Sequence, residues 1–165
     1  MIVTSIVKPI TLAEAAPGEL VRTRLGPSIA LAIVLKAEGT ENAVLGVLEE
    51  VQGLTQPFTH IKRERSAKCV SFGTAWVLEP KFDSNSWYGN RNFVGRPGAL
   101  HLSLDGWHLC FGPPPESMYS EFDYNLNTNE IGNIDNVVPA SGWNIWENEA
   151  ARLIPNAQPL FSHGG

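Results

Sequence analysis

Apolar residues along the chain fall into short runs that are separated by glycine, proline and asparagine, and no long helical period appears. The runs predict strands at residues 2–10, 19–23, 28–35, 43–48, 58–61, 69–78, 118–126 and 142–146. The run at 28–35 is almost continuously apolar, which is typical of a strand buried on both faces. Short helices are expected at 12–16 and 147–153, and the tail at 156–165 is expected to be frayed. The pattern predicts a mainly β fold, an antiparallel barrel or sandwich with short helical segments.

The sharpest pattern is at residues 99–111, where two alternating runs flank Asp105 and Gly106. Asp-Gly favours a two-residue type I′ turn, because both central residues of that turn need a positive φ. This turn pairs three apolar couples on one face: Leu104 with Trp107, Leu102 with Leu109, and Leu100 with Phe111. The other face then carries His101, Ser103, His108 and Cys110. We therefore expect the apolar face of this hairpin to form part of the core.

Residues 17–22, Pro-Gly-Glu-Leu-Val-Arg, resemble the opening of many SH3-like barrels, in which a Pro-Gly corner precedes the first barrel strand. The resemblance covers these residues alone. It implies an SH3-like barrel element within the β fold.

Length and composition predict one compact domain over residues 1–165, with a lobe boundary near the three prolines at 113–115. The longest apolar run, at 29–35, is too short to cross a bilayer, and the first residues lack the charged and long apolar regions of a signal peptide. Cys69 and Cys110 fit a reduced pair as well as a disulfide. We therefore expect a cytoplasmic chain with no membrane partner.

Charge is unevenly distributed along the sequence. The net charge of −5 combines a net +4 over residues 51–96 with a net −7 over residues 97–165. Such a division marks either a partner surface or two halves that complement each other in one fold. Because affinity for nucleic acid depends on neutralising phosphates, the acidic balance argues against a nucleic-acid partner.

A polar and aromatic loop at residues 81–98 is the leading candidate for a binding site. Long loops often carry function, and rigid aromatic rings beside amides suit contact with another protein or a small polar ligand. The residues expected to bind are Trp87, Tyr88, Asn90, Arg91, Asn92 and Phe93. The structural alternative is a loop that folds back and places Trp87 and Phe93 on the core.

The hairpin supplies a second candidate, since His101, His108 and Cys110 are possible zinc ligands or a thiolate–imidazolium pair. A fourth ligand would have to come from His60 or Cys69. The sequence has no CxxC or HxxxH spacing and no residue that orients a base, so ordinary core side chains are the favoured interpretation and no cofactor is expected. The basic run at 62–68 is interpreted as a solvated strand edge, with an acidic partner as the alternative.

Nucleotide-binding glycine loops, the nucleophile-elbow motif and the HExxH zinc motif are all absent from the sequence. The function expected from the sequence is therefore a non-catalytic binding or interaction module that uses the aromatic, Asn-rich loop on a β scaffold. Two alternatives stay open: a small Cys/His-dependent or zinc-dependent enzyme built on the 99–111 hairpin, and a structural or assembly subunit.

Overall fold

A computed structural model describes residues 7–53, 56–83, 96–114, 121–132 and 138–164. The chain divides into two compact units, Met1–Thr74 and Ala75–Gly165, and each is described by itself. The expected mainly β class is confirmed, because all pairings of the described strands are antiparallel and helix is confined to one short segment. The division falls after Thr74, within the stretch that the sequence pattern predicts as a single strand.

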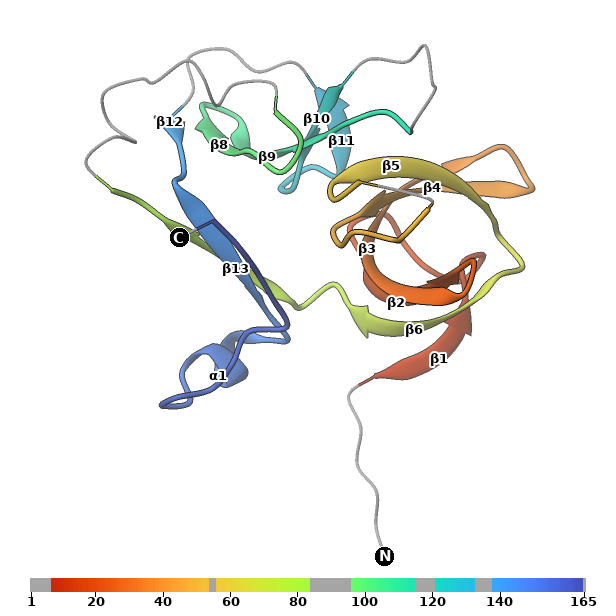
Figure 1. Cartoon of the computed structure of the whole chain (residues 1–165), viewed down its shortest axis with the longest axis horizontal. Helices are drawn as coiled ribbons and strands as arrows, with labels where there is room; N and C mark the ends of the chain where they lie inside the picture. The colour runs from red at the N-terminus through yellow and green to blue at the C-terminus, as the bar shows by residue number, and fades with distance from the viewer. Residues whose placement is uncertain (1–6, 54–55, 84–95, 115–120, 133–137, 165) are drawn as a thin grey trace, which may run out of the picture. The chain divides into compact units, whose positions relative to one another are not determined.

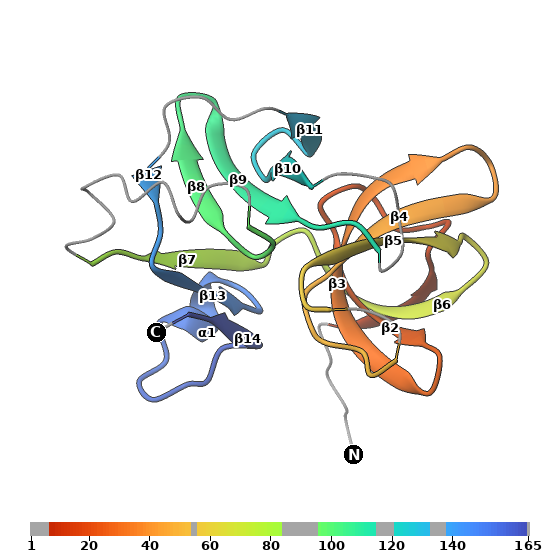
Figure 2. The same ribbon diagram turned by 45° about the horizontal axis from the view of Figure 1, so that its top comes forward.

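The first unit contains six strands in one sheet. They are β1 (Lys8–Thr11), β2 (Leu20–Leu25), β3 (Ser28–Glu38), β4 (Asn42–Val47), β5 (Thr59–Glu64) and β6 (Lys68–Gly73). Their order across the sheet is β1-β6-β2-β3-β4-β5, and the sheet is strongly curled in both ribbon views (Figures 1 and 2). The described residues do not close it into a barrel, since the edge strands β1 and β5 do not pair with each other.

Alternation of side chains explains how this sheet forms its core. In β2, Val21, Thr23 and Leu25 are buried, whereas Arg22 and Arg24 alternate with them and point to the other face. The core cluster draws on the inward residues of four strands and adjoining turns: Leu12, Val21, Leu25, Ala30, Ala32, Val34, Ala43, Leu45, Val47, Val51 and Cys69. The sheet therefore has one apolar side and presents two arginines on the other.

The central strand β3 is buried on both faces over most of its length. Ala30, Ala32 and Val34 join the core cluster, and the alternate residues Leu31 and Ile33 are also fully buried. This confirms the interpretation of the continuous apolar run at 28–35. Only its first apolar residue, Ile29, is exposed, at 61% of its surface.

The second unit contains two sheets and a single turn of helix. Its elements are β7 (Val77–Lys81), β8 (Leu100–Ser103), β9 (Gly106–Phe111), β10 (Phe122–Asn125), β11 (Glu130–Gly132), β12 (Val138–Pro139), β13 (Gly142–Trp146), α1 (Glu149–Arg152) and β14 (Phe161–His163). The sheet orders are β11-β10-β9-β8-β12 and β14-β13-β7. The three strands of the smaller sheet lie side by side beneath the β8–β9 hairpin in Figure 2.

The two sheets of the second unit are joined where β12 runs into β13. The Ala140 amide donates to the Leu100 carbonyl at 2.9 Å, and the next amide, that of Ser141, donates to the Lys81 carbonyl at 2.9 Å. Nearby, α1 begins at a conventional cap, since the Asn148 side chain accepts from the Ala151 amide at 2.8 Å. No helix in the described part of the chain combines the length and apolar character needed to span a membrane.

The single strand predicted at 69–78 is wrong. Gly73 has a φ of +74°, and the register with β2 shifts beside it, from Val21 opposite Ser71 to Leu20 opposite Gly73, as in a bulge; β6 ends there and does not continue. The chain re-enters a sheet at Val77 as β7, which contains Pro80 although proline was expected to stop it. An edge strand tolerates a residue without an N–H, and β7 is an edge strand.

Two smaller expectations are also corrected. Residues 12–16 form turns and no helix, because the Glu14 carboxylate accepts from the Thr11 amide at 2.8 Å and fixes a local turn. The tail is not frayed throughout, since Phe161–His163 pairs with β13 as β14. The predicted strands at 2–10 and 118–126 lie partly outside the described residues, and their described parts are β1 and β10.

Candidate functional site

The hairpin at 99–111 forms, but its turn is displaced by one residue. The strands pair Leu100 with Leu109 and Ser103 with Gly106, so Leu104 and Asp105 occupy the turn. Of the turn and its flanking residues, only Gly106 has a positive φ, at +133°, and the type I′ requirement is not met. The predicted register is therefore wrong.

The two faces of the hairpin keep their predicted members, because the displacement moves each cross-strand partner by two residues. Burial differs from the prediction. Leu104 is 96% exposed and Leu102 38% exposed, whereas His101, His108 and Cys110 on the polar face are fully buried. Of the apolar face expected in the core, the end formed by Leu100, Leu109 and Phe111 is therefore buried, and the end at the turn is exposed.

His108 belongs to a hydrogen-bonded cluster at the turn. Its Nε2 atom lies 2.9 Å from Asp105 Oδ1, and the Asn125 side chain donates to the Asp105 carbonyl at 3.2 Å. The Asn125 side-chain oxygen in turn accepts from the Asn127 amide at 2.8 Å. Because these groups bond to one another and to backbone, the cluster ties the β8–β9 turn at Asp105 to the end of β10 and the turn that follows it.

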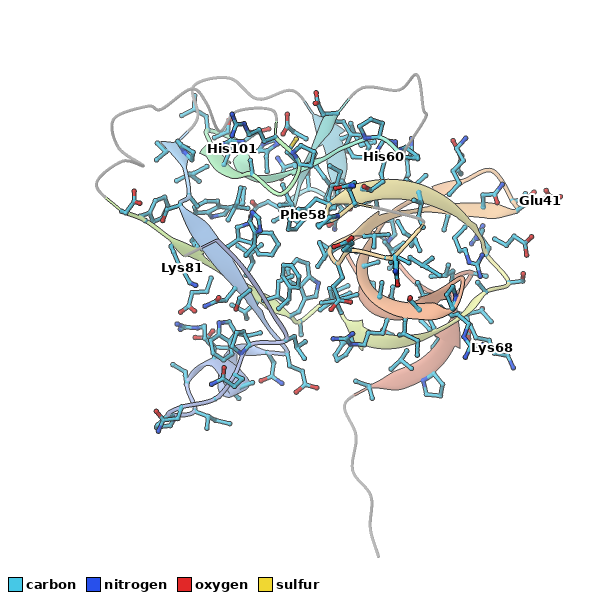
Figure 3. All side chains as sticks on the ribbon, viewed as in Figure 1. Glu41, Phe58, His60, Lys68, Lys81 and His101 are labelled. Atoms are coloured by element: carbon cyan, nitrogen blue, oxygen red, sulfur yellow. The ribbon has the colours of Figure 1, made fainter. Side chains whose placement is uncertain are left out.

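His101 lies further along the same face, paired with His108 across the strands (Figure 3). Both of its ring nitrogens are buried, and no described residue hydrogen-bonds to them. Burial, aided by the neighbouring His108, lowers the His101 pKa to about 4. This imidazole is therefore neutral at physiological pH.

Cys110 is equally unsuited to nucleophilic chemistry. Burial and the neighbouring Asp123 and Glu121 carboxylates raise the pKa of its thiol to about 12. A thiol must ionise to act as a nucleophile or metal ligand, and a buried thiol beside carboxylates stays protonated at neutral pH. Cys69 behaves alike, since burial raises its pKa to about 11, and both cysteines are free thiols.

Metal binding at the hairpin gains no geometric support. Among the residues that the structure describes, no three His, Cys, Asp or Glu side chains are grouped as a metal ion requires. His101, His108 and Cys110 share one sheet face, but they do not converge on a common point. The residues predicted to bind from the aromatic loop, Trp87, Tyr88, Asn90, Arg91, Asn92 and Phe93, lie outside the described residues.

The described residues form a different candidate site on the first unit, which we call the basic groove. It is an open hollow of about 680 Å³, lined mainly by β2 and β6 with single residues of β1, β3 and β5. Its lining residues are Pro9, Arg22, Arg24, Ile29, Arg63, Ala67, Lys68, Cys69 and Val70. Two of the apolar ones are exposed, Ile29 at 61% and Val70 at 37%.

The strand register explains why cations gather there. Arg22 pairs with Val70 and Thr23 with Cys69, and Arg24 and Lys68 are the next residues beyond these pairs on β2 and β6. Arg24 also pairs with Ile29 of β3. Two like charges and an exposed aliphatic side chain therefore lie together in the lining of the basic groove.

The cations of the basic groove differ in their partners. Arg22 forms an ion pair with Glu49 at 3.5 Å. No described carboxylate lies within ion-pair distance of Arg24, Arg63 or Lys68, and the buried Nε of Arg63 has no acceptor among the described residues. Lys68 projects from the start of β6 away from the core (Figure 3). Three guanidinium or ammonium groups thus face this hollow without a counter-charge in the described part of the chain.

The basic run at 62–68 divides between two roles. Lys62 forms an ion pair with Glu38 at 3.0 Å, and Arg65 donates to the Ala13 carbonyl at 3.1 Å, as expected of a structural strand end. Arg63 and Lys68 instead line the basic groove. Arg22, Arg24, Ile29 and Val70 were not predicted from the sequence, although two arginines alternating with Val21, Thr23 and Leu25 are a signal for one charged sheet face.

Comparison with known proteins adds no relative to this picture: no protein-family model, curated protein or solved structure matches the chain.

Proposed function

We propose that the chain is a non-catalytic binding module and that the basic groove of residues 1–74 is its site for an anionic ligand. The observation that carries the proposal is that Lys68, Arg24 and Ile29 line the same hollow. Like charges on neighbouring strands destabilise a sheet, and contact between an exposed aliphatic side chain and water is unfavourable. A ligand that supplies negative charge and apolar surface relieves both costs.

The chemistry of the hairpin supports this choice over an enzyme. The thiol of Cys110, with a pKa of about 12, and the imidazole of His101, with a pKa of about 4, are both uncharged at neutral pH. They are also fully buried, which leaves no access for a substrate. The buried hairpin face acts as structure in this proposal.

Two expectations from the sequence join the proposal. The aromatic loop that includes Trp87 and Tyr88 is a proposed binding surface of its own, for a protein or a small polar ligand. The curled six-stranded sheet is the SH3-like barrel element that residues 17–22 resemble, and its support is that β2 begins at Leu20 directly after the Pro17-Gly18 corner.

Titration of ¹⁵N-labelled protein with short poly-L-glutamate tests the anion site directly. We expect chemical-shift changes that centre on the amides of β2 and β6, and that fade as salt is raised. Lys68→Gln should weaken binding about two- to fivefold, the value of one exposed ion pair.

Lys36→Gln is the matched control, because Lys36 is an exposed lysine on β3 with no ion pair among the described residues. It lies seven residues beyond Ile29, which is about 23 Å along the strand. Equal weakening by both substitutions, or shift changes that avoid β2 and β6, would show that poly-L-glutamate responds to net charge alone and would refute the site.

A further inference from the structure

We infer that the ligand of the basic groove is an extended acidic segment of another protein that carries aliphatic side chains among its carboxylates. This inference rests on the proposed binding function and assigns its partner class. It draws on three features of the described residues: the spacing of the cations, the apolar surface between them, and the absence of aromatic rings from the lining.

The spacing of the cations suits alternate residues of an extended peptide. Arg22 and Arg24 are two positions apart on β2 and point to the same face, which separates their Cα atoms by about 6.6 Å. Alternate residues of an extended ligand have the same spacing. A planar guanidinium donates two parallel hydrogen bonds to a carboxylate, so each arginine can bind one acidic side chain of such a segment.

The charges in the basic groove favour this occupant because they are not already neutralised. Arg22 shares its charge with Glu49 at 3.5 Å, but Arg24 and Lys68 line the same hollow with no described carboxylate at ion-pair distance. A carboxylate that bridges Arg24 and Lys68 replaces a repulsion by two attractions. The gain in binding free energy from one carboxylate is therefore larger at this pair than at an isolated surface cation.

The apolar surface of the basic groove separates this ligand from a simple polyanion. Ile29 flanks Arg24 in one row, and Val70 flanks Arg22 in the next. Both aliphatic side chains are exposed on a sheet whose other face holds the core. Cores of protein interfaces combine apolar side chains with arginine in this way. A ligand with charge alone leaves Ile29 and Val70 in contact with water.

A nucleic acid fits the same surface poorly. Single-stranded nucleic acids are held by aromatic side chains on which the bases stack, and the lining of the basic groove has none. An acidic peptide can meet the cations while its aliphatic side chains cover Ile29 and Val70.

Three acetylated and amidated octapeptides of one design test the inference on the whole chain. The first, Leu-Ser-Glu-Ser-Glu-Ser-Leu-Ser, places two glutamates at alternate positions on one face of an extended strand, with a leucine on either side of them. The second replaces leucine by serine, and the third replaces glutamate by glutamine. A thymidine oligonucleotide provides a polyanion of another class. Affinity is read from the amide shifts of β2 and β6.

We expect the Glu/Leu peptide to bind at least about tenfold more tightly than the Glu/Ser peptide, because a buried aliphatic side chain adds that much affinity or more. The Glu/Leu peptide should also bind better than the Gln/Leu peptide and the oligonucleotide. Ile29→Ser should remove the preference for Glu/Leu over Glu/Ser, whereas Lys68→Gln should weaken both acidic peptides equally.

The outcomes separate the two proposals. Equal binding of the Glu/Leu and Glu/Ser peptides, or tighter binding of the oligonucleotide, with loss in Lys68→Gln, would overturn the partner class and leave the anion site intact. No shift at β2 or β6 with any probe would overturn both. Ile29 is exposed, so Ile29→Ser is expected to fold, and its amide spectrum establishes this before any titration.

Discussion

At the scale of single residues, the most informative side chain is His101. The alternation of the hairpin predicts that His101 and His108 share a face, and the structure confirms this by pairing them across the strands. The pattern does not predict that this polar face is buried, because alternation assigns residues to faces without showing what covers each face. Burial changes the role of His101 from a candidate ligand to a neutral core residue.

The lowered pKa of His101 predicts a dependence of stability on pH. In the unfolded chain His101 binds a proton below pH 6.5, the ordinary pKa of the group. In the folded chain it stays neutral until about pH 4. Stability is therefore complete above pH 6.5 and declines as the pH falls toward 4, by about 3 kcal/mol from this group. We expect His101→Leu to remove this part of the decline.

Urea unfolding of both proteins between pH 4 and 7 provides the measurement. Carboxylates with lowered pKa values, such as Glu79, also make the folded protein less stable in acid. Both proteins contain these groups, so their contribution cancels when the two free energies of unfolding are subtracted. If the two stability curves ran parallel through this range, the assignment of the pH dependence to His101 would be wrong.

At the scale of elements, the hairpin shows what a local pattern can and cannot determine. Asp-Gly correctly predicts a tight turn, but the position of that turn depends on a residue far along the chain. Asn127 Oδ1 accepts from the Trp107 amide at 2.7 Å, and a Cβ built on Gly106 would lie 2.3 Å from the same oxygen. Only glycine fits against Asn127, so Gly106 is fixed at the strand start and Leu104 moves into the turn.

The two registers predict different costs for truncating leucine. In the observed register Leu104 is 96% exposed, so Leu104→Ala should change the free energy of unfolding by less than about 0.5 kcal/mol. Leu109 is fully buried, so Leu109→Ala should cost about 2–5 kcal/mol. Chemical denaturation of the two variants gives both values, and a large cost at Leu104 would restore the register expected from the sequence.

At the scale of the whole molecule, the sequence predicts most strands but not the surfaces that they create together. The strands at 19–23, 28–35, 43–48 and 142–146 are found within a few residues of their predicted positions as β2, β3, β4 and β13. The basic groove was not predicted, because it exists only where β2 pairs with β6, with three other strands between them in sequence. Long-range pairing leaves no local pattern beyond the charged alternation of β2.

The division of the chain after Thr74 leads to the last prediction. All residues of the first unit's core cluster, from Leu12 to Cys69, come from residues 1–74, and so do all residues that line the basic groove. A segment that holds both its own core and its own site has what an independently folding domain needs, although one of this length buries a smaller share of its surface than a larger domain.

We expect residues 1–74, expressed alone, to unfold cooperatively and to give the same groove amide shifts with the Glu/Leu peptide as the full chain. An unfolded fragment beside a cooperative full chain would instead mean that residues 1–165 fold as one domain, as the sequence pattern predicts. Thermal unfolding followed by circular dichroism, together with the amide spectrum of the fragment, decides between these two results.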